Sequence, residues 1–174
     1  MFPIGSGARF NKDRTRRRLL WRAWDNKKPL CNFICLNPST ADEVKNDQSV
    51  AKMIGFSERL GAGSLVVTNI FDIMTTHPKD LYNWFSSKEL NSRANDKTIV
   101  EFANQATWVI LAWGNHGKLL DRDREVVNML GGYDLHRRMM VLRLNANGTP
   151  AHVLMLPYSC TPKRFKIQRS MRYE

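Results

Sequence analysis

The sequence contains no long hydrophobic run. No apolar stretch within its 174 residues approaches the ~18 residues that a membrane-spanning helix needs. The opening residues, MFPIGSGARF, do not place an apolar segment after a basic one, so we expect no signal peptide. A hydrophobic content of 43% and a mean hydropathy of −0.43 are ordinary for a soluble globular protein. We therefore expect a cytoplasmic protein without a membrane partner.

Cysteine is scarce as well. Cys31, Cys35 and Cys160 form no Cys-x-x-Cys pair, and three thiols are too few for a four-cysteine zinc site or an iron–sulfur cluster. We expect them to be reduced and buried. The four histidines show no metal-ligand spacing with cysteines or carboxylates, so the sequence predicts no metal site.

The loops that usually hold a phosphate or a serine nucleophile are missing. Neither Gly-x-x-x-x-Gly-Lys nor Gly-x-Gly-x-x-Gly occurs, and LGAGS (60–64) precedes a strand-like segment where a dinucleotide loop would follow one. There is no Gly-x-Ser-x-Gly turn either. These absences argue against a bound nucleotide cofactor, and we expect no cofactor of any kind.

Charge of one sign is abundant. The chain has 27 Lys and Arg against 16 Asp and Glu, a net charge of +11, which favours polyanionic partners. Two basic segments with interleaved Phe, 8–18 and 161–172, flank a nearly balanced middle. They adjoin predicted structure, which favours nucleic-acid contact over a role as solvated tails. The expected contacts are Arg14, Arg16, Arg17, Arg18, Lys163, Arg164 and Lys166.

Apolar runs alternate with helical patterns along the whole chain. Strands are predicted at 33–36, 64–71 and 107–113 and at 139–144 and 151–156 around an Asn-Gly turn, and helices at 47–61, 77–85, 87–105 and 118–132. The segment 19–30 is ambiguous between a short helix and an edge strand. The alternation predicts a single domain over 1–174, a three-layer α/β/α arrangement with a mainly parallel central sheet of about four strands. These strands are 33–36, 65–70, 107–113 and 152–156.

Polar residues follow three of these strands directly. The stretch CNFICLNPSTADE (31–43) passes from an apolar run to Asn37 and Pro38, a second strand ends at Asn69, and a third is followed by Gly114, Asn115 and His116. The carboxyl ends of parallel strands gather at one edge, where ligands bind in open α/β sheets. Each loop alone is compatible with ordinary turn chemistry. Three on successive strands indicate a site, and an amide can match the donor and acceptor of a base edge.

The motifs resemble those of a known domain family. FICLNPSTADE, LVVTNIFDIMTTHP, Asn95-Asp96, VILAWGNHG and NGTPAHVLML occur in the order found in a domain family of bacterial and phage proteins. The hallmark of that family is a Leu-Asn-Pro-Ser-Thr-Ala-Asp loop. The resemblance covers residues 15 to 157 and brings no established activity.

The same motifs are more distantly similar to the uracil-DNA glycosylase superfamily, in which a first strand ends in Asn-Pro or Asp-Pro. The fold that this similarity implies is uracil-DNA glycosylase-like. It implies that Asn37 holds the attacking water and that Asn69 faces the base. The substrate-binding residues that it implies are Pro38, Ser39, Thr40, Asn69, Trp113, Gly114 and His116.

The fourth motif of that superfamily differs here. Its last strand enters a His-Pro-Ser loop that presses into the DNA minor groove, whereas this chain has Leu-Pro-Tyr-Ser at 156–159. The nearest histidine, His152, stands four to five residues earlier in the chain. We assign His152 to the stabilisation of the leaving base, and His116 is the alternative.

Three functions remain open from the sequence. The first is base excision of the DNA glycosylase type, acting on a flipped nucleotide in DNA repair or modification. The second is a non-catalytic nucleic-acid-binding module of phage or bacterial defence or counter-defence. The third is an enzyme acting on free nucleosides or nucleotides, which would not need the two basic segments. The expected partner is nucleic acid, with DNA favoured over RNA.

Overall fold

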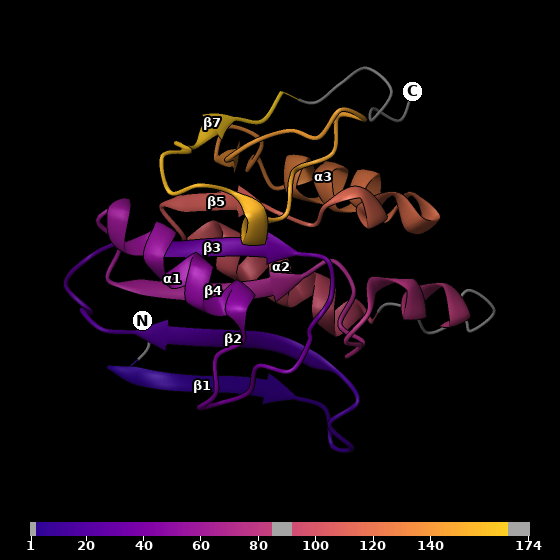
Figure 1. The fold of residues 1–174 in the computed structure, drawn as a ribbon, viewed down its shortest axis with the longest axis horizontal. Helices are drawn as coiled ribbons and strands as arrows, with labels where there is room; N and C mark the ends of the chain where they lie inside the picture. The colour runs from indigo at the N-terminus through magenta and orange to yellow at the C-terminus, as the bar shows by residue number, and fades with distance from the viewer. Residues whose placement is uncertain (1–2, 85–91, 167–174) are drawn as a thin grey trace.

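The centre of the molecule is one seven-stranded sheet. The structure is a computed structural model and describes residues 3–84 and 92–166. The strand order is β1-β2-β4-β3-β5-β6-β7 (Figure 1). The strands are β1 (Gly5–Phe10), β2 (Arg17–Ala23), β3 (Leu30–Cys35), β4 (Ser64–Asn69), β5 (Trp108–Leu111), β6 (Met139–Val141) and β7 (Lys163–Arg164).

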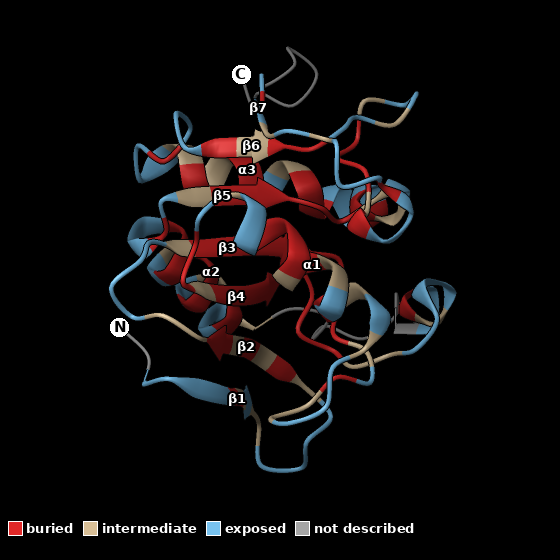
Figure 2. Cartoon of the chain, turned by 60° about the vertical axis from the view of Figure 1, so that its left-hand side comes forward, coloured by how far each residue is buried: buried red, intermediate tan, exposed pale blue. Residues whose placement is uncertain are grey.

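The sheet is mixed. Strands β4, β3, β5 and β6 pair in parallel, while β1 and β2 extend the sheet in antiparallel pairing on one side and β7 on the other. The chain therefore has the predicted mixture of α and β structure, but its sheet is larger than the predicted four strands. Figure 2 shows β3 to β5 buried and β1 largely exposed, so the parallel strands lie in the core.

The fourth parallel strand is β6, and the prediction of a strand at 152–156 is wrong. That segment forms a short 3-10 helix, η3 (Val153–Met155), between Pro150 and Pro157. A proline cannot donate to a strand ladder, so both ends of the segment are poor strand positions. Val153 and Leu156 are both buried and stand three residues apart, as on one face of a helical turn. This turn packs against α1, and no strand forms beside β6.

The ambiguous segment 19–30 belongs to a strand through Ala23, and this strand is not at the edge. β2 lies between β1 and β4, with Leu20 opposite Val67. The edge is formed by β1, a strand that the sequence pattern does not predict. The basic segment 8–18 is therefore the hairpin of β1 and β2 and part of the sheet, not a flank beside the domain.

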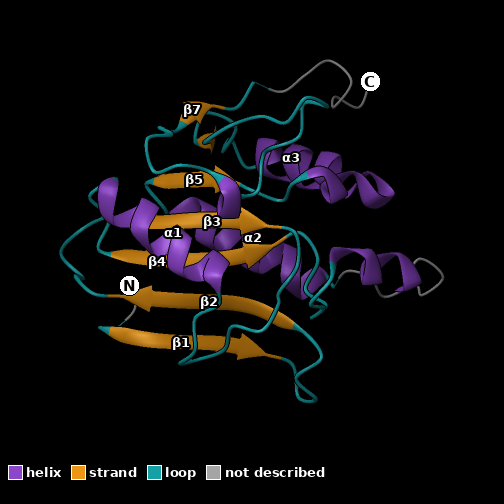
Figure 3. Ribbon diagram, in the orientation of Figure 1, coloured by secondary structure: helices purple, strands orange, loops and turns teal. Residues whose placement is uncertain are grey.

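Helices cover both faces of the sheet. The α-helices are α1 (Gln48–Arg59), α2 (Arg93–Gln105) and α3 (Arg122–Gly132), and the 3-10 helices besides η3 are η1 (Pro78–Trp84) and η2 (Asn115–Asp121). Asp47 caps α1 by accepting from Val50 N–H, and Ser92 caps α2 in the same way. α1 lies on one face and α2 and α3 on the other, each over its own apolar cluster (Figure 3). Residue 85 of the predicted helix 77–85 and residues 87–91 of the predicted helix 87–105 lie outside the described residues.

The loop between β3 and α1 is held by arginines of the β1–β2 hairpin. Arg22 is only 6% exposed and donates to Asp42 O at 2.8 Å, to Lys45 O at 3.2 Å and to Asn46 Oδ1 at 2.8 Å. One guanidinium thus satisfies several acceptors of a segment that has no regular secondary structure. Backbone carbonyls in such a loop need partners when water is excluded.

Two further arginines act on the same loop. Arg17 is 2% exposed and donates to Ala41 O at 2.5 Å, and Arg14 pairs with Glu43 at 2.7 and 2.9 Å. Burial lowers the pKa of Arg17 to about 10, which keeps it charged at neutral pH. We refer to Arg14, Arg17 and Arg22 as the arginine clamp.

Arg22, one of the two buried members of the clamp, should contribute more to stability than the exposed Arg14. Arg22→Met keeps the aliphatic length but leaves the loop acceptors without their donor, and we expect a loss of about 2–4 kcal/mol in the free energy of unfolding. Arg14→Met is the matched control, and it should cost less because exposed ion pairs contribute little. Urea unfolding followed by circular dichroism measures both. Equal losses would contradict the role given to Arg22.

Candidate functional site

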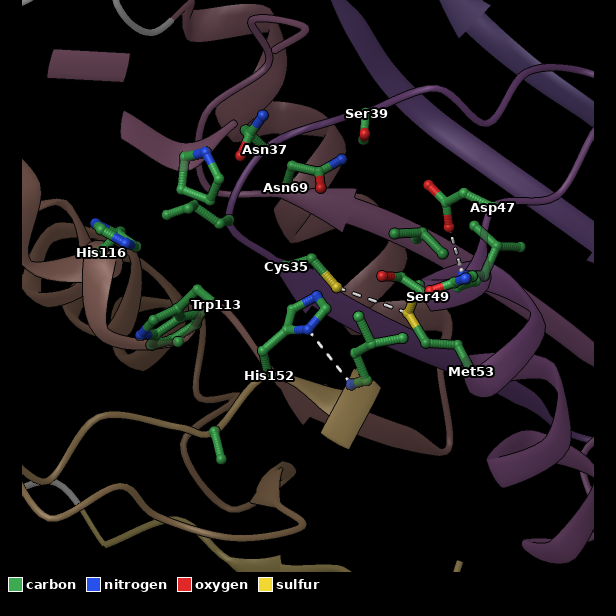
Figure 4. Close-up of a pocket in the computed structure, with 18 of the residues that line it drawn as sticks. Cys35, Asn37, Ser39, Asp47, Ser49, Met53, Asn69, Trp113, His116 and His152 are labelled. Carbon is green, nitrogen blue, oxygen red and sulfur yellow. Dashed lines mark hydrogen bonds between the residues drawn. The ribbon is translucent and has the colours of Figure 1, made fainter. Parts of the chain in front are cut away.

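A pocket of about 770 Å³ opens at the carboxyl ends of β3, β4 and β5. The chain leaves β3 toward β4 on one side and later forms β5 on the other side of β3. This reversal is a topological switch point, the place where open α/β sheets leave a crevice for ligands. The pocket lies on the α1 face, and the amino end of α1 forms part of its wall (Figure 4).

The pocket collects nearly all of the residues that the sequence predicted for it. The predicted residues in its lining are Asn37, Ser39, Thr40, Asn69, Trp113, Gly114, His116 and His152. Pro38 is buried beside the lining. The strand ends and the segment around His152 therefore meet at one concave site.

Asn69, the last residue of β4, is the most unusual group in the pocket. Its side chain is 1% exposed, and its Nδ2 has no hydrogen-bond partner among the described residues. Its backbone carbonyl, in contrast, accepts from Asn95 Nδ2 at 2.9 Å. Figure 4 shows the amide directed toward the side of the pocket where Ser39 and Asp47 lie. Buried polar groups almost always have partners, so this amide is available to a ligand.

Only Oδ1 of the Asn37 side chain is free to bind a ligand in the pocket, because Nδ2 is already hydrogen-bonded. Its Nδ2 donates to Pro38 O, Thr75 O and Thr75 Oγ1, each at 2.9 Å. These bonds fix the turn after β3 to the segment after β4. Its Oδ1 has no partner within the described part of the chain, so the amide can accept a hydrogen bond from a water but has no free N–H to give.

His152 enters the pocket from the cap of η3. Its Nδ1 accepts from Leu154 N–H at 3.3 Å, which places the proton of the neutral ring on Nε2. Burial lowers the pKa of His152 from its ordinary value of 6.5, and the carboxylate of Asp47 offsets this in part. His152 is thus neutral at pH 7, with Nε2–H as its free donor. His152 stands four to five residues before the end of the predicted strand, which would have placed it far from the site. Because 152–156 does not form a strand, His152 can still reach the pocket.

His116 lines the same pocket from η2. Its Nδ1 lies 3.3 Å from the hydroxyl of Tyr82, and the two rings meet edge to face with centroids 5.9 Å apart. This contact occupies one ring nitrogen with a residue of η1. Both histidines that the sequence proposed for the leaving base therefore reach the pocket, but with different partners.

Gly114 and Trp113 shape the end of β5. Gly114 has φ +71°, in the left-handed region that favours glycine, and its N–H donates to Pro150 O at 2.9 Å. Trp113 is buried and packs so closely on Gly117 that a Cβ there would lie 2.1 Å from the indole Cδ1. The two residues thus join β5 to η2 and to the turn before His152.

Several lining residues were not found from the sequence. Asp47 and Arg143 add their charges to that of Arg17, and Cys35, Met53 and Val67 form an apolar wall. Burial raises the pKa of the Cys35 thiol to about 12, so it is no nucleophile at neutral pH. The sequence did contain a signal for Asp47. It stands at the start of the predicted helix that follows the Asn-Pro loop, and a helix in this position begins at the same edge of the sheet as Asn37.

The predicted nucleic-acid contacts in the β1–β2 hairpin have partners inside the protein. Arg16 Nη1 lies 2.5 Å and Arg18 Nε 3.5 Å from the carboxylate of Asp72, which is 0% exposed and also accepts from Ser92 Oγ at 2.7 Å. Arg17 belongs to the pocket wall. Four of the seven predicted contacts, counting Arg14, therefore contribute to intramolecular contacts.

The other three predicted contacts lie at the opposite end of the sheet. Lys163 and Arg164 form β7, and with Lys166 they are exposed. Five strand spacings of ~4.8 Å separate β2 from β7, or about 24 Å. The described parts of the two basic segments thus lie on either side of the pocket and form no single patch. Residues 167–172 of the second segment lie outside the described residues.

The described part of the chain offers neither a metal site nor a membrane-spanning helix. Within residues 3–84 and 92–166, no group of three or more His, Cys, Asp or Glu side chains is placed to hold a metal ion. No helix in the same ranges is long and apolar enough to cross a bilayer. The three cysteines are free thiols, two of them buried.

Comparison with known proteins identifies one family. The model of the protein family of unknown function DUF1643 matches residues 17–154. Curated proteins and solved structures gave no significant match. The matched region contains the parallel strands and every pocket-lining residue except Met155. Because the match covers most of the chain, the protein belongs to the DUF1643 family.

Proposed function

We propose that the pocket binds a nucleobase of a nucleotide flipped out of DNA and that the protein hydrolyses its N-glycosidic bond. The observation that carries the proposal is the buried, unpaired Nδ2 of Asn69 at the switch point. An unsatisfied buried donor costs about 1–3 kcal/mol, which a ligand that accepts from it would recover.

The pocket has the shape and chemistry that a base requires. Its volume of about 770 Å³ lies within the usual range for small-ligand sites. Val67, Met53 and Cys35 offer an apolar wall to the face of a flat ring. The amide of Asn69 offers a donor and an acceptor to its edge, as amides do in base recognition.

Base excision needs a held water and a stabilised leaving group, and the site has candidates for both. Asn37 Oδ1 is free to accept from a water, and its orientation is fixed by the hydrogen bonds of Nδ2 and by the adjacent proline. His152 Nε2–H can donate to the departing base as negative charge develops there. These are the roles that the resemblance to the uracil-DNA glycosylase superfamily implies.

A nucleic-acid substrate fits the charge better than a free nucleoside does. The net charge of +11 favours a polyanion. Arg143 is exposed and lines the pocket, where it can contact the phosphate next to a bound base. Lys163, Arg164 and Lys166 are exposed on one side. These cations extend beyond what a pocket for a single nucleoside would need.

The first test is excision itself. Oligonucleotides that contain uracil, hydroxymethyluracil or other modified bases should give strand breaks when treated with alkali after incubation with the protein. Asn37→Ala should lower the rate by about 100-fold, since the water would lose its acceptor. Asn128→Ala is the control, because Asn128 also has an unpaired Nδ2 but lies outside the pocket. Tight binding with no breaks on any substrate would instead favour the non-catalytic binding module.

The substitution Asn69→Ala should reduce the preference of the pocket for one base over another. Without its donor and acceptor the pocket should lose about 1–3 kcal/mol of discrimination, measured by competition between oligonucleotides that differ in one base. The fold should be kept, because the side-chain nitrogen has no partner to lose. A variant that does not fold would show that Asn69 is structural.

His152 should titrate below its ordinary range. Its pKa is lowered in the folded protein, so the unfolded state binds the proton more readily and stability should fall as pH drops from 6.5 toward the folded pKa. The NMR signal of its ring, assigned with His152→Gln, reports the titration. Asp47→Asn should lower that pKa further, because it removes the charge that raises it. A midpoint above 6.5 would refute the neutral donor.

A further inference from the structure

Asp47 is the one carboxylate among the described residues that line the pocket. It caps α1, and one of its oxygens accepts from Val50 N–H at 2.8 Å. Figure 4 shows the other oxygen turned toward the interior of the pocket, on the side that Asn69 faces. No ion pair joins Asp47 to another described residue, so this oxygen is open to a ligand or a water.

The proposed reaction needs a proton acceptor that Asn37 cannot supply. An amide oxygen can orient a water but has no useful basicity, whereas a general base must be able to take up a proton. Apart from the two arginines, four of the residues that line the pocket can ionise: Cys35, Asp47, His116 and His152.

Three of these four are less suited to accept the proton of a water. Cys35 keeps its proton, since burial raises the pKa of its thiol to about 12. His152 uses Nδ1 to accept from Leu154 N–H, so the atom that it presents to the pocket is a donor. His116 has no helix cap to position it: its Nδ1 contacts the hydroxyl of Tyr82 at 3.3 Å, and Tyr82 is an exposed residue of η1. Asp47 alone combines an acceptor atom without a partner with a position fixed by a helix cap.

We propose that Asp47 is the general base that takes the proton of the attacking water, an inference that rests on the hydrolytic function proposed above. Asn37 Oδ1 would then orient the water without accepting a proton. The unpaired Nδ2 of Asn69, across the same space, supports a ligand between these groups.

The step balances without an oxidant or a cofactor. The water oxygen bonds to C1′ of the sugar, and its proton moves to the carboxylate of Asp47. The bond from C1′ to the base breaks, and its electron pair leaves with the base. Hydrogen bonds from Asn69 Nδ2–H and His152 Nε2–H stabilise that charge until the base is protonated. Asp47 returns its proton to solvent, and the products are the free base and an abasic sugar.

Asp47→Asn is the decisive variant because asparagine also caps helices. It should lower kcat for base excision by about 100-fold or more and remove the acid limb of the kcat–pH profile. The affinity for the oligonucleotide should be unchanged. Asp42→Asn is the matched control: Asp42 lies in the same loop and accepts from Val44 and Lys45 N–H, but it does not line the pocket. Its rate and pH profile should remain those of the wild type.

The outcomes separate this inference from the function on which it rests. If the wild type removes no base from any oligonucleotide, the hydrolytic function fails and the role of Asp47 with it. If the wild type is active and Asp47→Asn keeps its rate and pH profile, only the role of Asp47 is overturned. Should Asp47→Asn fail to fold, Asp47→Ser, which also caps, takes its place. Added formate should restore at least tenfold activity to Asp47→Ser; a folded, slow variant with an unchanged acid limb and no rescue would make Asp47 structural.

Discussion

The site depends on the hydrogen bonds between the guanidinium of Arg22 and the loop that joins β3 to α1. This loop runs from Leu36 to Asp47 and contains Asn37, so it carries both groups that would act on a water. It has no strand or helix of its own, and its carbonyls at 42 and 45 find their donor in β2. The antiparallel strand next to β4 is thus required for the geometry of the pocket, even though the pocket lies at the ends of the parallel strands.

Interactions of this kind also reduce the number of positive charges that are available to a partner. An excess of arginine in one segment is typical of a surface for polyanions, and the composition of 8–18 predicts such a surface. In the structure Arg17 of this segment is buried, and Arg16 and Arg18 pair with the buried Asp72. Net charge describes attraction at a distance but not which cations remain available. Any nucleic acid must be bound by those that do, such as Arg143 at the mouth of the pocket.

The sequence predicted what depends on neighbouring residues and missed what depends on distant ones. The strand ends at Asn37, Asn69 and Trp113 follow from apolar runs that stop at polar residues, and the structure brings them together in one pocket. β1 has an exposed, glycine-containing sequence without the alternation of a half-buried strand, so only its pairing with β2 identifies it. The choice of 139–141 over 152–156 as the fourth parallel strand has a local signal in Pro150 and Pro157, but it also depends on the packing of η3 against α1. The free oxygen of Asp47 depends on the direction in which α1 begins, which no local pattern specifies.

The segment after β4 explains why the unpaired amide of Asn69 points to a ligand and not to poor packing. On the α2 and α3 side the backbone here is fully bonded, with Asn95 donating to Asn69 O and Arg122 Nε to Ile70 O at 2.9 Å. Asn32 also has an unpaired Nδ2, but its Oδ1 accepts from Thr68 Oγ1 and it lies within the sheet, outside the pocket. At Asn69 the protein satisfies the backbone from one face and leaves the side chain without a partner on the other. Such an arrangement fixes an amide in place while keeping its hydrogen bonds for a molecule that enters the pocket.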